Sequence, residues 1–267
     1  MLVAQLSDTH IVDARKRYAG SDPQQYLRDA IAAIVGLSER PTCVLVTGDL
    51  VNRGKPGEYA RFRSIMDALP MPYFVIPGNH DDRDALRTAL PSQTFGGSRE
   101  RTIRFAIDDF EVRLVGLDAN RAGSPGAALD DESFAWLEAT LAEPKPTIVA
   151  IHQPPFRTGL HYLDVFGFRG ARRLRALVAR HPHVGRVICG HIHCVRRRRA
   201  GDALIVSAPS TVPTAVPLVF MGGRMLGVRR EPPGFALHAW STTLGFRTAT
   251  YRRDPDGTYA LAAERDP

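Results

Sequence analysis

The sequence lacks a cysteine framework, and it lacks any long apolar run. Three cysteines occur in 267 residues, at Cys43, Cys189 and Cys194. This odd and sparse number excludes a disulfide scaffold and indicates a reducing compartment. We therefore interpret the cysteines as core residues, Cys194 included although it follows His193. No stretch approaches the roughly 20 apolar residues of a membrane span.

The first residues, MLVAQLSDTH, have no basic leader, and their apolar run is too short for a signal peptide. A cytoplasmic location is therefore expected.

Lysine is also scarce, at positions 16, 55 and 145, so arginine carries nearly all of the positive charge. The formal net charge is +7, which favours anionic partners such as phosphate esters, nucleotides, nucleic acid or lipid headgroups. A uniform arginine excess also arises from genome composition, so the charge alone does not predict nucleic-acid binding. The densest cluster, Arg196 to Arg199, is interpreted as a solvated turn or strand end, with a phosphate-binding rim as the alternative.

What is present is an ordinary globular composition, with 44% hydrophobic and 24% charged residues. The length suits one large α/β domain, alone or with a small appendage. Short apolar runs rich in Val and Ile, with Gly or Pro at their ends, predict buried strands. They cover residues 2–7, 43–48, 73–78, 112–117, 147–151, 186–190 and 203–207.

Amphipathic helices are expected between these runs, over residues 23–39, 57–69, 130–143 and 170–181. Alternating strands and helices predict a layered α/β fold. The chain after residue 208 is rich in Pro and Gly and then alternates like antiparallel strands. We predict a catalytic core over 1–207, a loop or arm over 208–235 that caps the site or mediates oligomerisation, and strands over 236–267 that complete a second sheet.

Polar residues follow five of the apolar runs directly. Ligands bind beyond the carboxyl ends of strands in such sheets, so these residues are expected to converge. Each cluster alone is typical of a turn, a cap or a core histidine, but their shared position favours a metal site. They form a nitrogen and oxygen set without sulfur, and comprise Asp8, His10, Asp49, Asn79, His152, His191 and His193.

This ligand set suits manganese, iron, zinc or cobalt. Seven groups exceed one tetrahedral site and fit two divalent ions that share a carboxylate. Two such ions clamp a phosphoryl group and supply hydroxide at neutral pH. His80, next to Asn79, is free to stabilise the phosphoryl charge or to protonate the departing oxygen.

The ordered segments DTH, GDLVNRG, GNHDD, IHQPP and CGHIH resemble the signature of the calcineurin-like binuclear metallophosphoesterases. The resemblance implies the metallo-dependent phosphatase fold, an α/β four-layer α-β-β-α sandwich of two mixed sheets flanked by helices. It implies that the first metal is held by Asp8, His10, Asp49 and His193, and the second by Asp49, Asn79, His152 and His191. Asp49 bridges, and His80 is catalytic together with Asp49 and Asn79.

The segments LSDTH, RYAG, GDLVNRGKPGEY and PYFVIPGNHDDR resemble the bacterial class III cyclic nucleotide phosphodiesterases and the related glycerophosphodiesterases. This implies hydrolysis of a small phosphodiester by a metal-bridging hydroxide, without a covalent intermediate. It also implies a homodimer or higher homo-oligomer. Gln153 follows His152 where many relatives have a second histidine, which alters the pocket but leaves the ligand.

Four further residues are candidates for contacting substrate: Arg15, Tyr18, Asn52 and His161. The sequence assigns Asp81, Asp82 and Arg83 to capping the following helix. A phosphomonoesterase, a nucleotide-lipid pyrophosphatase or a nuclease on the same core are the alternative activities. The non-enzyme alternative is a protein-binding scaffold that shares the fold.

Overall fold

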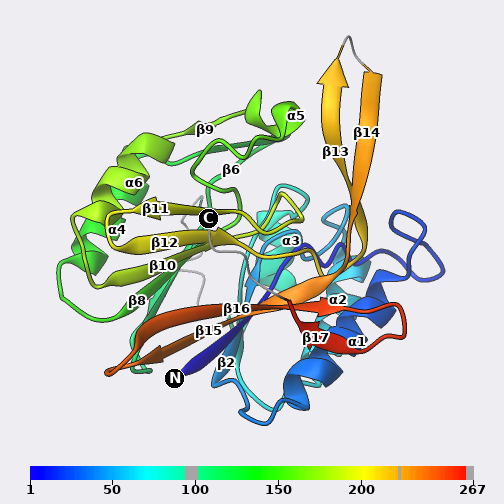
Figure 1. Cartoon of the computed structure of the whole chain (residues 1–267), viewed down its shortest axis with the longest axis horizontal. Coiled ribbons are helices and arrows are strands. Elements are labelled where there is room, and N and C mark those ends of the chain that lie inside the picture. Colours follow the sequence, from blue (N-terminus) through cyan, green and yellow to red (C-terminus); the bar gives the residue numbers. More distant parts are fainter. Residues whose placement is uncertain (94–101, 222–223, 263–267) are drawn as a thin grey trace.

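The computed structural model describes residues 1–93, 102–221 and 224–262, with side chains described outside 215–230. Two six-stranded sheets pack face to face (Figure 1). The first has the order β17-β16-β15-β1-β2-β3, in which β1, β2 and β3 are parallel and β15 runs antiparallel to β1. Its strands are β1 (Leu2–Leu6), β2 (Cys43–Thr47), β3 (Tyr73–Ile76), β15 (Gly234–Ser241), β16 (Gly245–Arg253) and β17 (Tyr259–Leu261).

The second sheet has the order β11-β12-β10-β8-β5-β4, with the four inner strands parallel and both edges antiparallel. Its strands are β4 (Arg104–Ile107), β5 (Arg113–Leu117), β8 (Thr147–Ile151), β10 (Val184–Cys189), β11 (Arg197–Ala200) and β12 (Ala203–Ser207). All seven predicted runs are strands of these two sheets. The edge strands β4 and β11 of the second sheet lie outside the seven predicted runs.

Helices cover the outer face of each sheet. The helices α1 (Pro23–Val35), α2 (Pro56–Met66) and α3 (Arg83–Ala89) share one buried cluster with the first sheet. The helices α4 (Asp131–Leu141) and α6 (Ala171–Ala179) share another with the second sheet. A third cluster fills the space between the sheets. The four-layer sandwich predicted from the sequence is therefore confirmed.

The predicted helices form, but they end earlier than the apolar pattern suggests. Asp22 caps α1 by accepting bonds from the backbone N–H groups of Gln24 and Gln25, and Pro23 occupies its first turn. Gly36 ends this helix. The seven-residue α3 is the helix expected after the capping residues, although the sequence pattern set no bounds for it. Sequence reasoning missed the single-turn α5 (His161–Asp164), which is too short to display a helical period.

Two smaller sheets complete the chain. The strands β6 (Asn120–Arg121), β7 (Ser124–Ala128) and β9 (Phe168–Arg169) form one. The strands β13 (Thr214–Met221) and β14 (Arg224–Glu231) form a hairpin within the predicted arm, and it projects from the body of the molecule in Figure 1. Within the described residues, no helix is long and apolar enough to cross a membrane.

The strands expected within 236–267 join one of the two large sheets. The strand β15 pairs with β1, so β15, β16 and β17 extend the sheet that contains the N-terminal strand. This pairing spans the full length of the chain, and no local pattern reveals which sheet these strands join. The last five residues of that range lie outside the described part.

A buried polar chain crosses the layer between the sheets. Gln5 on β1 donates to the Thr47 hydroxyl (2.8 Å) and to the Cys189 carbonyl (2.9 Å), which links both sheets. Its amide oxygen lies 3.0 Å from Nε2 of His238, and the other ring nitrogen lies 3.0 Å from the Thr248 hydroxyl. Because the amide oxygen can only accept, His238 carries its proton on Nε2.

His238 is fully buried, and burial followed by the nearby charges of Arg186 and Arg197 lowers its pKa to about 3. An unfolded histidine has a pKa of about 6.5. As the pH falls below this value, the unfolded chain takes up a proton at His238 and the folded chain does not. Stability from this site is therefore lost as the pH falls.

We predict that His238→Gln weakens the acid sensitivity of the fold. Between pH 7 and pH 5, the metal-free wild type should lose about 2 kcal/mol more unfolding free energy than the variant, because only histidine titrates in the unfolded state. Urea unfolding at both pH values, with chelator present, measures the two changes. Comparing changes removes any constant cost of the substitution, and equal losses in both proteins would contradict the prediction.

Candidate metal centre

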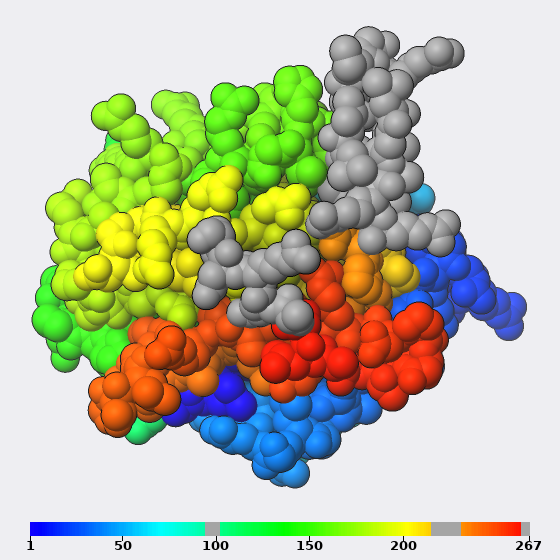
Figure 2. All heavy atoms as spheres, viewed as in Figure 1, coloured from blue at the N-terminus to red at the C-terminus, as the bar shows by residue number. Residues whose placement is uncertain are grey.

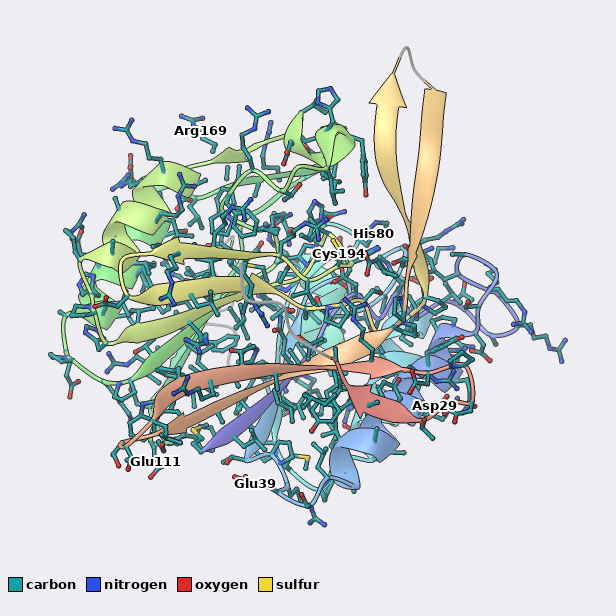
Figure 3. All side chains as sticks on the ribbon, viewed as in Figure 1. Asp29, Glu39, His80, Glu111, Arg169 and Cys194 are labelled. Carbon is teal, nitrogen blue, oxygen red and sulfur yellow. The ribbon has the colours of Figure 1, made fainter. Side chains whose placement is uncertain are left out.

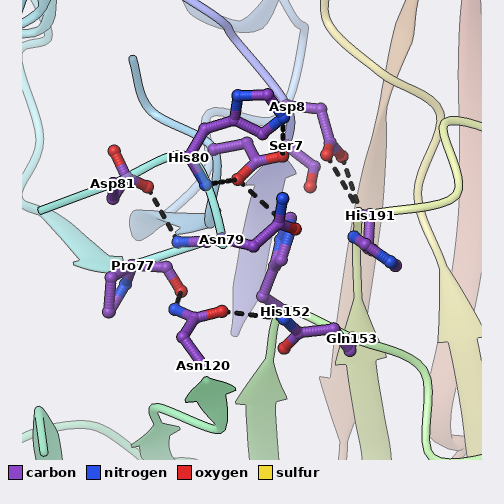
Figure 4. A network of polar contacts seen from close by, with 12 residues as sticks. Ser7, Asp8, Pro77, Asn79, His80, Asp81, Asn120, His152, Gln153 and His191 are labelled. Carbon is purple, nitrogen blue, oxygen red and sulfur yellow. Dashed lines mark hydrogen bonds and ion pairs between the residues drawn. The ribbon is translucent and has the colours of Figure 1, made fainter. Parts of the chain in front are cut away.

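The residues predicted as ligands lie just beyond the carboxyl ends of strands of the two sheets. Asp8, Asp49 and Asn79 follow β1, β2 and β3, while His152 follows β8 and the two later histidines follow β10. Figure 4 shows side chains from both sheets gathered in one network. One group places ligand atoms of Asp8, His10, Asp49 and His193 within 4.8 Å of one another, and a second does so for Asp49, His152 and His191.

Asp49 is the one residue that the two groups share. Its Oδ2 lies 3.8 Å from Nε2 of His10, and its Oδ1 lies 3.4 Å from Nε2 of His152. Asn79 joins the second group, since its side-chain oxygen lies 3.2 Å from the same His152 nitrogen. The arrangement therefore has two adjacent pockets of nitrogen and oxygen donors with a carboxylate between them.

The protonation states suit a cation. Burial lowers the pKa of both His10 and His191 to about 3, so both rings are neutral and keep a lone pair. Burial alone would raise the pKa of the Asp49 carboxyl, but the adjacent His152 holds it well below its usual value. The centre therefore combines anionic oxygens with the neutral imidazoles of His10 and His191.

Two ring nitrogens at the centre lack an ordinary protein hydrogen-bond arrangement among the described residues. Nε2 of His10 faces Nε2 of His193 at 3.2 Å, and the buried Nδ1 of His10 has no hydrogen-bond partner among the described residues. Two ring nitrogens directed at one point are typical of ligands around a shared ion. The residues present therefore fit a two-ion centre.

His152 is positioned from behind by the main chain. Its Nδ1 lies 2.7 Å from the Thr47 carbonyl, which can only accept, so this nitrogen carries a hydrogen and Nε2 faces Asp49. Burial opposes a charge on His152, yet Asp49 and Asp8 raise its pKa to about 9. A metal that binds Nε2 at neutral pH must therefore displace a proton.

The backbone at the centre is held in a sparsely populated conformation. Seven non-glycine residues of the described chain have positive φ, and five of these are predicted ligands. Such angles are uncommon outside glycine and persist where the surrounding structure enforces them. The five are Asp8 (53°), His10 (43°), Asp49 (50°), His191 (68°) and His193 (55°).

A glycine precedes a ligand in three of the loops because the loops approach one another closely. A Cβ on Gly78 would lie 2.1 Å from Oδ1 of Asp49, and one on Gly190 would lie 2.0 Å from the Ser7 hydroxyl. One on Gly48 would lie 2.5 Å from Nδ1 of His152. The glycines of the GD, GN and GH segments are therefore needed for the loops to meet.

His80 lies at the open side of the centre, and its side chain is 39% exposed. Its Nδ1 lies 2.9 Å from the Asn52 carbonyl and therefore donates to it, and its Nε2 lies 4.0 Å from Oδ2 of Asp49. Figure 3 labels His80 within the region where the ends of the two sheets meet. Asn52, a predicted substrate contact, thus orients His80 through its backbone.

The other predicted substrate contacts have different surroundings. The Tyr18 ring stacks on His10 with centroids 4.2 Å apart, so it supports a ligand. Arg15 and His161 are exposed, and neither belongs to the two ligand groups. Cys194 is buried in a small apolar cluster with Leu160 and Ile192, as its interpretation as a core residue requires.

Sequence reasoning missed the loop-holding role of Asp81. Only Asp82 caps α3 as expected. The buried Asp81 carboxylate accepts from the backbone N–H groups of Gly78 (2.8 Å) and Leu50 (3.1 Å), which joins the loops after β2 and β3. A carboxylate beside a helix start resembles a cap in sequence, so no local signal separates the two roles.

Sequence reasoning also missed a network through which residues of the second sheet's side of the molecule support the loop that follows β3. Arg83 forms an ion pair with Asp118 instead of capping the helix. Asn120 donates to the Pro77 carbonyl (2.9 Å) and accepts from the Gln153 side chain (2.8 Å). Through Asn120, Gln153 thereby ties the His152 loop to the Asn79 loop.

Comparisons with known proteins agree with this geometry. A family model described as calcineurin-like phosphoesterase matches residues 1–195. A glycerophosphodiester phosphodiesterase from Enterobacter lignolyticus is 40% identical over 219 residues, which cover 79% of this chain and 78% of that protein. A 3′,5′-cyclic adenosine monophosphate phosphodiesterase from Pseudomonas aeruginosa is 28% identical over 238 residues, covering 88% and 84%.

The fold has a counterpart among solved structures. A dimetal phosphatase from Danio rerio superposes with a TM-score of 0.69 over 93% of this chain and 94% of that one, at 16% identity. At this identity the likeness shows the fold alone.

We predict that Gly78→Ala weakens metal binding. The added methyl would overlap Asp49 and force the shared carboxylate or the Asn79 loop to shift, so manganese affinity should fall at least tenfold at one or both sites. Calorimetric titration of the stripped protein with manganese measures this.

Gly57→Ala is the matched control, because its Cβ would meet only the ends of two side chains, Nη1 of Arg61 at 3.4 Å and Oδ1 of Asp13 at 3.6 Å. It should bind two metals as the wild type does. Wild-type binding at both sites in Gly78→Ala would show that the close approach of Gly78 to Asp49 is not required.

Proposed function

Because the chain belongs to the calcineurin-like phosphoesterase family, we propose that it hydrolyses small phosphodiesters, with glycerophosphodiesters as the first natural candidates and cyclic nucleotides as the second. The observation that carries the proposal is the pair of ligand groups that share Asp49, with His80 beside them. The chain is a metal-dependent phosphodiesterase of this family. The order of candidates follows the 40% and 28% identities of the two relatives.

We assign Asp8, His10, Asp49 and His193 to one metal and Asp49, Asn79, His152 and His191 to the other. Two divalent ions held there would neutralise the phosphoryl oxygens and lower the pKa of a bound water. The protein's part is to hold these donors in place, and the strained loops, the glycines and the Thr47 carbonyl do so. Manganese, iron, zinc and cobalt all suit this donor set.

His80 is assigned as the proton donor. The Asn52 carbonyl occupies its Nδ1, so in the imidazolium form Nε2 carries the transferable proton. The oxygen of water bonds to phosphorus and releases a proton to solvent, one ester P–O bond breaks, and the departing oxygen takes a proton from Nε2. The partial exposure of His80 lets the ring regain its proton from solvent.

Two finer features remain part of the proposal. The hairpin of β13 and β14, which projects from the body, suits a homo-oligomer contact. The three buried thiols suit a cytoplasmic location. The monoesterase, lipid pyrophosphatase and nuclease activities are alternatives that a substrate panel separates, and the complete ligand set argues against a scaffold.

We predict metal-dependent turnover with a preference for diesters. Metal-stripped protein should be inactive and should regain activity with manganese. The panel holds a chromogenic phosphodiester, its monoester, 3′,5′-cyclic AMP, 2′,3′-cyclic AMP and glycerophosphoethanolamine.

Asn79→Ala should reduce turnover by about two orders of magnitude or more and weaken the binding of one metal, because a direct ligand is lost.

Circular dichroism checks that Asn79→Ala stays folded. A monoester preference would transfer the protein to the phosphatase alternative. Near-normal activity of Asn79→Ala would disprove the ligand assignment.

We predict that His80→Ala keeps both metals but loses rate, most severely for diesters with poor leaving groups. A good leaving group departs without a proton, so the loss should shrink as the leaving-group pKa falls. Rates for a series of aryl and alkyl diesters measure this dependence, and metal analysis supplies the control. A uniform loss across the series would exclude His80 as the proton donor.

A further inference from the structure

A second polar site lies between the sheets, away from the metal centre. It is a groove of ≈ 940 Å³ between the β10-β12-β11 edge of the second sheet and β16 of the first. In Figure 2 the yellow surface of β11 and β12 lies above the orange-red surface of β16. We call it the arginine groove, after Arg186, Arg197, Arg198, Arg199 and Arg247 among its lining residues.

The register of the strands directs the arginines to a common space. Arg199 pairs with Leu204, and Leu204 pairs with Arg186, so the two arginines lie in one row across three strands. Paired residues point to the same face, and two strand spacings separate their backbones by about 10 Å. Two arginine side chains that reach toward each other can therefore close on one anion.

The charge of the arginine groove is one-sided. Asp202 is the one carboxylate among its described lining residues, against five arginines. Four of these arginines share the groove, because Arg198 lies on the opposite face of β11 with its guanidinium 5.7 Å from the centre of the Phe156 ring. Burial, followed by the charges of Arg199, Arg197 and Arg247, lowers the pKa of Arg186 to about 10. The arginines thus repel one another, and an anion in the groove would relieve this repulsion.

The Arg186 side chain lies recessed in the groove and is held in place by hydrogen bonds. It is 8% exposed and donates to the Thr248 hydroxyl and to the carbonyls of Gly185 and Phe246. These bonds use three of the five guanidinium N–H groups and leave one on each terminal nitrogen. A flat membrane or a DNA duplex cannot reach a recessed guanidinium, whereas a compact anion can.

The groove is separate from the reaction site. None of the proposed ligands, nor His80, is among its described lining residues. His191 follows Arg186 by five residues, which is about 16 Å of extended chain. A ligand there would not displace substrate from the metals.

We propose that the arginine groove is a second anion site, which binds a compact ligand with two or more phosphate groups. The planar guanidinium matches phosphate oxygens in pairs. Four clustered positive charges require more negative charge than one phosphate supplies. The Arg196–Arg199 run, which the catalytic site leaves without a role, thereby gains one.

Calorimetry with tripolyphosphate tests the proposal on the full chain, both loaded with manganese and after chelation. The groove's contribution is the binding present in both forms. Arg199→Gln/Arg247→Gln should weaken it at least tenfold, and both residues are exposed, so the fold is not threatened. Hydrolysis of the chromogenic diester should keep its wild-type kcat/KM, which separates this result from any failure of the catalytic proposal.

Arg169→Gln/Arg172→Gln is the matched control, since it removes the same charge from exposed residues outside the groove. Figure 3 shows Arg169 projecting from the molecule beside β9. This control should bind tripolyphosphate as the wild type does. Equal weakening in both double variants would reduce the effect to net charge and overturn the site.

Other probes fix the ligand class. Orthophosphate should bind at least tenfold more weakly than tripolyphosphate, and equal binding would overturn the requirement for several phosphates. Comparing ATP with tripolyphosphate distinguishes a nucleotide ligand from free polyphosphate. If either one binds the wild type and this binding is lost in the groove variant, the result supports a site for linked phosphate groups. Tight binding of duplex DNA or anionic vesicles that disappears in the groove variant, without tripolyphosphate binding, would overturn the compact-anion proposal.

Discussion

The close approach of loops from two sheets is the constraint on which the rest of this structure depends. Asp49 lies at the meeting point, where its carboxylate borders donors from both sheets. That position exists because Gly78 leaves room that a single methyl group would fill. The positive φ angles of five predicted ligands are the conformational cost of this convergence. The four-layer core supplies the rigidity that maintains them.

The layer between the sheets has a polar part as well as an apolar one. The apolar cluster there fixes the spacing of the sheets. The chain from Gln5 to His238 and Thr248 satisfies buried polar groups and reaches Arg186, which lies recessed in the arginine groove. Fully satisfied networks of this kind specify one arrangement of the strands. The same layer thus supports the metal centre at one end and presents charge at the other.

The sequence predicted elements where pattern and local chemistry agree. The run CVLVTG became β2, and Asp22 with Pro23 began α1, since capping and burial act over a few neighbouring residues. Predictions weakened where partners are distant in the chain. Asp81 and Arg83 were read as caps, but they bind Gly78 and Asp118. Asn52 was read as a substrate contact, and the sequence did not indicate that its backbone carbonyl also orients His80.

By itself, the sequence determined the donor types, their order and their place after apolar runs, because these are properties of residue identity and local pattern. It therefore indicated two metals and a phosphoester chemistry. Tertiary structure alone decided which loops touch and that β15 pairs with β1. It also turned the Arg196–Arg199 run into a groove by placing Arg186 and Arg247 opposite it. Such contacts join residues far apart in the chain, and only folding brings them within reach.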